Sequence, residues 1–159
     1  MQHEGPINQA DPAFFDTPVL QDSFQCATGG QNIRNLLTTI IGQIDARCHG
    51  ADDLARNAEI VLAEVLNNIE EHGYEGRAGG QIKLDLKVFD DRITVQTTDF
   101  GQPMPGLQLP VQSLPDANGA CEDLPEGGFG WFLIHTLAPE PDYKRRGRTN
   151  ILNFTIRNL

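Results

Sequence analysis

The chain has 159 residues, of which 39% are hydrophobic, so it is long enough for one domain with a core and too short for an enzyme with a separate substrate lobe. Its 22 acidic and 12 basic residues give a net charge of −10, which argues against a nucleic-acid partner held by its phosphates. It shows no basic apolar leader and no membrane-spanning apolar run, and its three cysteines form no C-x-x-C pair. We therefore expect reduced thiols, a cytoplasmic location and no membrane contact.

The first part of the chain predicts a strand and two helices behind a loose arm. Residues 1–17 carry no sustained period, which predicts a flexible N-terminal arm, and a weak strand follows over 19–26. Spacings of three and four then join a set of apolar residues into one helix face: Ile33, Leu36, Leu37, Ile40, Ile41 and Ile44. Thr28 and Gln31 could close a capping box at the start of this helix. A second helix is predicted over 52–73, from an aspartate cap to a glycine stop.

The later part changes to a period of two, which predicts strands. Apolar and polar residues alternate on either side of an Asp-Asp turn, over 82–88 and over 93–95. The remaining predicted elements are a weak strand over 142–145, a helix over 131–137 and a last strand over 152–156. Two long helices with these strands predict an α+β fold, a two-layer α/β sandwich with the helices on one face of a mixed, mostly antiparallel sheet.

A polar stripe on the second helix is the first candidate site. Glu64, Asn68 and His72 are spaced by four and stack on one line, about 6 Å apart per step. A solvated helix face would explain Glu64 and His72, and His72 could equally interact with the helix dipole. The Asn67-Asn68 pair is costly in mid-helix, however, and calls for another reason. A carboxylate and an amide oxygen on adjacent turns can hold a Mg²⁺ shell and orient a hydroxyl or a water.

Asp99 and Asn150 form the second candidate. Counting by twos from Ile93 places Asp99 on the face under the helices, where a carboxylate is costly without a partner. Asn150 shares the inward parity of Leu152, so the two polar side chains could form one pocket floor. Gly101 would free the backbone for close approach of a ligand. The alternative for Asp99 is a cap on nearby turn amides, which is common before glycine.

Three glycines, Gly127, Gly128 and Gly130, lead directly into the short apolar helix. Glycine amides at a helix N-terminus form a cradle for phosphate, although many such clusters are only flexible hinges. These glycines end a long irregular segment, roughly 100–128, which is rich in proline and glycine and could close over a bound nucleotide.

In this order, the motifs resemble those of the GHKL ATPase superfamily. AEVLNNIEEHGY (63–74) is similar to its N-box, TTDFGQPMPG (97–106) to its first glycine box and EGGFGWFLI (126–134) to its second. The chain length and the ending YKRRGRTNILNFTIRN (143–158) are most similar to the bacterial anti-sigma-factor serine/threonine kinases.

The resemblance implies a role for each candidate residue in a site for ATP. Asp99 would accept a hydrogen bond from the adenine amino group, and Gly101 would make room for the ring. Asn68 would be the magnesium ligand, and Glu64 the general base that orients the attacking hydroxyl. Gly127, Gly128 and Gly130 would contact the phosphates and hinge the lid. Apart from the resemblance, their positions predict that His72, one turn after Asn68, helps to shape this cofactor site and that Asn150 lies on its floor.

The resemblance also implies a Bergerat-type ATP-binding kinase domain over 18–159 with a lid at about 103–128. Family members bind a sigma factor and phosphorylate a serine of a small anti-anti-sigma antagonist of the STAS type, which releases the sigma factor. Pro103 departs from the D-x-G-x-G pattern at the second glycine, which stiffens the loop and removes an amide donor. No Lys or Arg lies between Arg92 and Lys144, so Mg²⁺, backbone amides and a partner's side chain must neutralise the triphosphate.

Two functions follow for this sequence. The first is a Mg²⁺/ATP-dependent protein serine kinase that acts as an anti-sigma factor in partner switching. The second is a non-catalytic switch module in which ATP only orders the lid. A histidine-kinase catalytic domain fits poorly, because only about 50 residues precede the second helix and they predict no dimerisation hairpin. The exposed face of the first helix could serve a homodimer. The basic run Lys144, Arg145, Arg146 and Arg148 is interpreted as a solvated hairpin rather than a docking patch.

Overall fold

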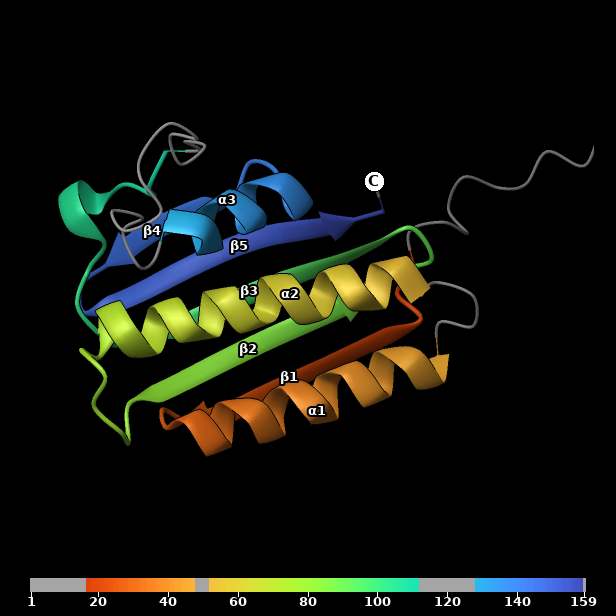
Figure 1. Ribbon diagram of the computed structural model, residues 1–159, viewed down its shortest axis with the longest axis horizontal. Helices are drawn as coiled ribbons and strands as arrows, with labels where there is room; N and C mark the ends of the chain where they lie inside the picture. The colour runs from red at the N-terminus through yellow and green to blue at the C-terminus, as the bar shows by residue number, and fades with distance from the viewer. Residues whose placement is uncertain (1–16, 48–51, 112–127, 159) are drawn as a thin grey trace, which may run out of the picture.

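The computed structural model describes residues 17–47, 52–111 and 128–158 of the chain. In chain order they form β1 (Leu20–Ala27), α1 (Gly30–Arg47), α2 (Asp52–Asn68), the π-turn η2 (Ile69–Gly73), β2 (Gln81–Val88), β3 (Arg92–Asp99), the 3-10 turn η3 (Pro105–Leu107), α3 (Gly128–Leu137), β4 (Asp142–Arg146) and β5 (Thr149–Arg157). Figure 1 shows α1 and α2 running side by side across the sheet, with α3 next to α2 on the side of β5.

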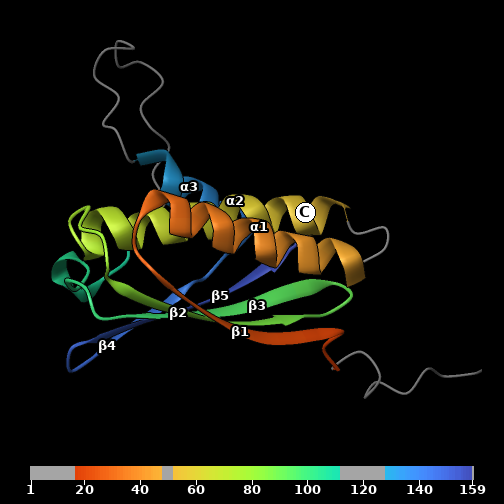
Figure 2. The same ribbon diagram turned by 90° about the horizontal axis from the view of Figure 1, so that it is seen from below.

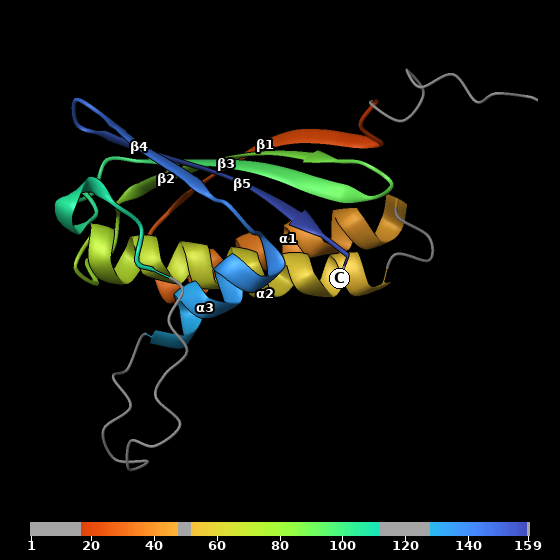
Figure 3. The same cartoon turned by 90° about the horizontal axis from the view of Figure 1, so that it is seen from above.

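The five described strands form one sheet in the order β1-β2-β3-β5-β4. Each pairing within this sheet is antiparallel, so the described strands contain none of the parallel pairs that a mixed sheet would need. Figures 2 and 3 show the three helices gathered on one side of the sheet as a second layer. The predicted fold class, an α+β two-layer sandwich, is therefore confirmed.

The core lies between the two layers and fixes the helices above the strands. Its helical residues come mainly from the inward faces of α1 and α2: Ile33, Leu36, Ile40, Ile44, Leu54, Ala58, Val61, Leu62, Val65 and Leu66. Its strand residues alternate as predicted: Ile82, Leu84, Leu86, Ile93, Val95, Leu152, Phe154 and Ile156. Truncation of a core residue such as Leu62 to alanine typically costs about 2–5 kcal/mol.

The start of α1 differs from the predicted capping box. The Thr28 hydroxyl donates a hydrogen bond to the carbonyl oxygen of Arg77 at 2.7 Å and accepts one from the backbone N–H of Gly80 at 2.7 Å. The side chain of Gln31 donates to Asn35 one turn further along α1. The capping box is therefore wrong, because antiparallel pairing of β1 with β2 brings Thr28 to the loop before β2, where its hydroxyl finds two backbone partners.

The end of the second helix also differs from the prediction. The helix continues to Gly73 as predicted, but after Asn68 it widens into η2, where the N–H of Tyr74 bonds to the carbonyl oxygen of Ile69 at 3.0 Å. Single π-turns of this kind occur frequently at functional sites. Among the described residues, no helix combines the length and the apolarity that crossing a bilayer requires.

Candidate functional site

A cavity of about 660 Å³ lies where the end of the second helix meets the ends of β3 and β5. Its walls come from α2 and η2 (Val65, Asn68, Ile69, Glu71, His72, Gly73), the turn after η2 (Glu75), the sheet (Thr97, Asp99, Tyr143, Asn150, Leu152), the loop after β3 (Gln102, Pro103, Met104, Pro105, Pro110, Val111) and α3 (Trp131). Of the predicted site residues, Asn68, His72, Asp99 and Asn150 all line it.

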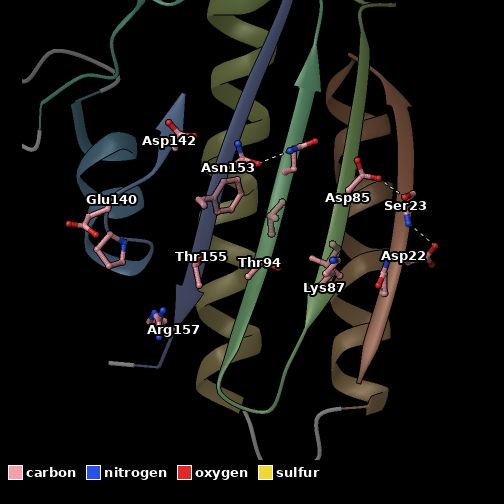
Figure 4. A pocket seen from close by; sticks show the side chains of 16 residues that line it. Asp22, Ser23, Asp85, Lys87, Thr94, Glu140, Asp142, Asn153, Thr155 and Arg157 are labelled. Carbon is pink, nitrogen blue, oxygen red and sulfur yellow. Dashed lines mark hydrogen bonds between the residues drawn. The ribbon is translucent and has the colours of Figure 1, made fainter. Parts of the chain in front are cut away.

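A second hollow of about 640 Å³ lies over the opposite, outward face of the sheet (Figure 4). Polar side chains from five strands cover it, and Ser23 of β1 donates a hydrogen bond to Asp85 of β2. Among the described residues, none of the predicted site residues lines this hollow. The cavity beneath the helices is therefore the candidate functional site.

Asp99 is the buried carboxylate on the cavity floor. It ends β3 with its side chain inward, and only 5% of its surface is exposed. Its Oδ1 accepts two hydrogen bonds of 2.8 Å, from the N–H of Gly101 and from Nδ2 of Asn150. Burial raises the pKa of Asp99, while these two hydrogen bonds and the charge of Arg145 act to lower it. Among the described residues no donor bonds to Oδ2, which leaves that oxygen available to a ligand.

Asn150 reaches Asp99 because the two residues are register partners across β3 and β5. The bond to Gly101 shows that the turn-cap reading of Asp99 also holds, so the carboxylate caps the turn with one oxygen and keeps the other free. The structure thus brings the two residues of the predicted pocket floor together.

Gly101 packs directly against the backbone of Gly73, which lines the cavity, although Gly101 is not itself among the lining residues. The N–H of Gln102 donates to the carbonyl oxygen of Gly73 at 2.6 Å. A Cβ atom on Gly101 would collide with that same carbonyl and lie 2.6 Å from its carbon. Glycine is required at 101 because the backbone that ends η2 occupies the space of a side chain.

Glu64 and Asn68 lie together against the first turn of α3. Asn68 is buried, and its Nδ2 has no hydrogen-bond partner in the described part of the chain. A Cβ atom on Gly130 would lie 2.5 Å from Oε2 of Glu64 and 3.9 Å from Nδ2 of Asn68. The carboxylate and the amide therefore sit beside the positive end of a helix dipole, a place that suits anions.

The remaining predicted site residues lie in η2, at the start of α3 or outside the described part of the chain. His72 is exposed and lines the cavity from η2. Gly128 and Gly130 belong to the first turn of α3, which begins three residues earlier than its apolar pattern predicts. Gly127 and residues 112–127 of the predicted lid lie outside the described residues, whereas residues 103–111 supply cavity walls.

Two residues of β4 that the sequence did not single out for the site reach the cavity floor. Tyr143 and Arg145 each donate a hydrogen bond of 2.7 Å to Oδ1 of Asn150. Arg145 is half-buried, so the interpretation of its basic run as wholly solvated is wrong for this residue. The alternation of side chains along a strand could have identified them, because Tyr143 and Arg145 are two residues apart and share one face of the short strand that pairs with β5.

This fold is that of an ATPase-type domain, and comparison with known proteins agrees. Residues 31–156 match the family described as histidine kinase-like ATPase domain. The chain therefore belongs to that family.

Its curated relatives include bacterial proteins named serine-protein kinase RsbW. The protein of Halalkalibacterium halodurans is 32% identical over 108 residues, which are 67% of this chain and 64% of that protein. The protein of Staphylococcus epidermidis is 29% identical over 118 residues, 72% of this chain and 74% of the relative. One from Bacillus cereus is 30% identical over 100 residues, 62% and 61% of the two chains. The matched segment thus covers less than two thirds of the length of the Halalkalibacterium halodurans protein and of the Bacillus cereus protein.

Proposed function

We propose that this protein is an ATP-dependent serine/threonine protein kinase that acts as an anti-sigma factor, phosphorylating a serine of an anti-anti-sigma antagonist of the STAS type. Three things support the proposal: family membership, similarity to proteins named serine-protein kinase, and the cavity. The observation that carries it is the placement of Glu64 and Asn68 against Gly130, at the N-terminus of the helix that borders a cavity floored by Asp99.

The floor of the cavity suits an adenine ring. Asp99 offers Oδ2 to the exocyclic amino group of adenine, while its Oδ1 is held by Gly101 and Asn150. A hydrogen bond to a charged acceptor contributes about 1.5–3 kcal/mol. Apolar walls from Val65, Ile69 and other lining residues provide the contact surface that a purine needs.

The residues at the α3 end of the cavity fit a magnesium ion bound with ATP. The Asn68 carboxamide is buried and has an unpartnered polar atom, so it can turn either its oxygen or its nitrogen toward a ligand. Carboxamide and carboxylate oxygens are ligands that Mg²⁺ accepts. When bound, Mg²⁺ would neutralise the charge of the phosphates, because the described residues that line the cavity include no Lys or Arg to do so.

Glu64 would act as the general base. The serine hydroxyl of the antagonist would give its proton to the Glu64 carboxylate as its oxygen attacks the terminal phosphorus of ATP. The bond between that phosphorus and the bridging oxygen breaks, and ADP leaves. The amides of the first turn of α3, near Gly128 and Gly130, would hold the phosphates.

The test is phosphate transfer from terminally labelled ATP, with Mg²⁺, to STAS-type antagonists encoded near this chain in its genome. We expect label on one antagonist with the wild-type protein. ATP binding with no label on any of them would instead favour the non-catalytic switch. Absence of ATP binding would contradict both functions.

A further inference from the structure

We propose that Tyr143 and Arg145 of β4 are positioning residues that lock the amide of Asn150 and thereby set the selectivity of Asp99 for adenine over guanine. The proposal rests on the proposed ATP site and adds to it two residues that lie outside the N-box and the two glycine boxes. It starts from a hydrogen-bond network that links β3, β4, β5 and the loop after β3.

The oxygen of the Asn150 amide is surrounded by donors. Nη1 of Arg145 lies 2.7 Å from Oδ1, and a guanidinium can only donate. The Tyr143 hydroxyl lies 2.7 Å from the same oxygen and accepts a hydrogen bond from the N–H of Met104 at 3.0 Å. The acceptor side of this hydroxyl is thus engaged by Met104, which leaves its proton for Asn150.

The nitrogen of the same amide is surrounded by acceptors. Nδ2 of Asn150 lies 2.8 Å from Oδ1 of Asp99 and 3.0 Å from the carbonyl oxygen of Gln102. Donors on one side and acceptors on the other leave one orientation for this amide, which is only 6% exposed. Turning it over would place two oxygens against each other at the Asp99 contact.

This orientation decides which part of Asp99 faces a ligand. With Oδ1 bonded to both Asn150 and Gly101, the carboxylate is held with Oδ2 free. Adenine presents an amino group, which donates to a carboxylate, whereas guanine presents a carbonyl oxygen at the corresponding ring position, which a carboxylate repels. A carboxylate free to rotate, or protonated to donate a hydrogen bond, would lose this discrimination.

Arg145 also tightens the site through the backbone and through charge. Its Nη1 bonds to the carbonyl oxygen of Gly101 at 2.8 Å, so one guanidinium holds both the loop after β3 and Asn150. Its charge favours the ionised form of Asp99, the form that rejects guanine.

The experiment measures dissociation constants for ATP and GTP by calorimetry, in Mg²⁺, for the wild type and for Arg145→Met, Tyr143→Phe and Arg146→Met. We expect Arg145→Met to lower the preference for ATP over GTP by roughly tenfold, because it removes a charged hydrogen bond to Asn150. Tyr143→Phe removes a neutral hydrogen bond and should lower the preference by about two- to tenfold. The control Arg146→Met removes the same charge from the next, exposed position of β4 and should keep the wild-type ratio.

The ratio of the ATP affinity to the GTP affinity distinguishes the loss of a positioning residue from a general loss of structure. A less ordered structure would weaken the binding of ATP and of GTP equally and leave the ratio of the two affinities unchanged. A misoriented Asp99 carboxylate would change that ratio. Tyr143→Phe removes one oxygen and keeps the ring, so it carries the test alone if Arg145→Met fails to fold. An unchanged ratio in every folded variant overturns this proposal and leaves the ATP site intact. A wild-type protein that binds no ATP overturns the proposed function as well.

Discussion

Asp99 is the residue at which ligand binding and stability conflict. It is a carboxylate 5% exposed, and burial raises its pKa because the charged form loses hydration. A raised pKa in the folded state means that the folded state binds the proton more tightly than the unfolded state. Ionised Asp99 therefore lowers the free energy of unfolding at neutral pH, and this cost disappears as the pH falls through its folded-state pKa.

Asp99→Asn should weaken ATP binding by about 10- to 100-fold, the loss of a hydrogen bond to a charged acceptor. The same change should leave the ligand-free protein as stable as the wild type or more stable at pH 7, since the amide oxygen can still accept from Gly101 and Asn150. Calorimetry with ATP and urea unfolding at pH 7 and at acid pH measure both effects, and any gain in stability should shrink at acid pH.

The control for that change is Asp90→Asn, which removes an equal charge from the exposed turn between β2 and β3. It should alter neither ATP affinity nor the pH dependence of unfolding. An Asp99→Asn protein that binds ATP like the wild type would leave Asp99 as a turn cap alone.

Glu64→Gln should separate binding from phosphate transfer. Glutamine has nearly the same shape and helix propensity but cannot take the proton of the serine hydroxyl, so the transfer rate should fall 10²- to 10⁴-fold while ATP affinity changes little. The measurements are a transfer assay and a binding isotherm. Glu59→Gln, on an exposed position of α2, is the matched control and should transfer at the wild-type rate. Equal rates for both variants would remove Glu64 from the mechanism.

At the scale of elements, strand parity was the most informative property of the sequence. A period of two predicted β2, β3 and β5 and correctly turned Asp99 and Asn150 inward to meet. Because β4 is rich in basic residues, its sequence does not show which side chains point inward. Arg145 was therefore predicted to be exposed to solvent like its neighbours. The net charge of a run does not reveal which member lies next to a buried carboxylate.

Helix ends were less predictable than helix faces. The apolar stripe predicted α2, yet the π-turn after Asn68 depends on the loop after β3, whose Gln102 N–H bonds to Gly73. The sequence did not predict that α3 starts at Gly128, because glycines are poor helix formers and the apolar pattern begins only at Trp131. The end of the second helix thus involves a tertiary contact, which local sequence does not encode.

Two glycine substitutions should differ because of what each would touch. Gly101→Ala meets the backbone of Gly73, which cannot move aside, so we expect loss of both stability and ATP binding. Gly130→Ala meets only the end of the Glu64 side chain, which can swing away. Alanine favours helix by about 1 kcal/mol, so this variant should stay folded but transfer phosphate more slowly as the carboxylate is displaced.

Thermal unfolding and the transfer assay distinguish these outcomes. Gly42→Ala in α1 is the control, because no atom within 4 Å would contact the added carbon. It should raise stability by up to about 1 kcal/mol and leave transfer unchanged. If Gly130→Ala transfers phosphate as fast as Gly42→Ala, the packing of α3 against Glu64 is not needed for catalysis.

At the scale of the whole molecule, the distribution of charge is the main constraint on function. The chain carries a net charge of −10, and Glu71, Glu75 and Asp99 line the cavity. The stretch without Lys or Arg that the sequence showed between Arg92 and Lys144 has a structural counterpart, since neither Lys nor Arg is found among the described residues that line the cavity. A triphosphate entering it would face repulsion from carboxylates, which backbone amides and the helix dipole would oppose.

ATP binding should therefore depend strongly on Mg²⁺. We expect the affinity for ATP, measured by calorimetry, to fall by more than about tenfold when EDTA replaces Mg²⁺, a difference of at least about 1.4 kcal/mol. Adenosine is the control ligand, because it offers the same amino group to Asp99 and carries no phosphate, so its affinity should be equal in both buffers. Asn68→Ala should reduce the Mg²⁺ effect on ATP and leave adenosine binding unaltered, since Asn68 is the buried residue with an unpartnered amide at the phosphate end. Equal ATP affinity in EDTA and in Mg²⁺ would mean that protein groups alone neutralise the phosphates, and the lack of Lys and Arg among the described lining residues would then need a different explanation.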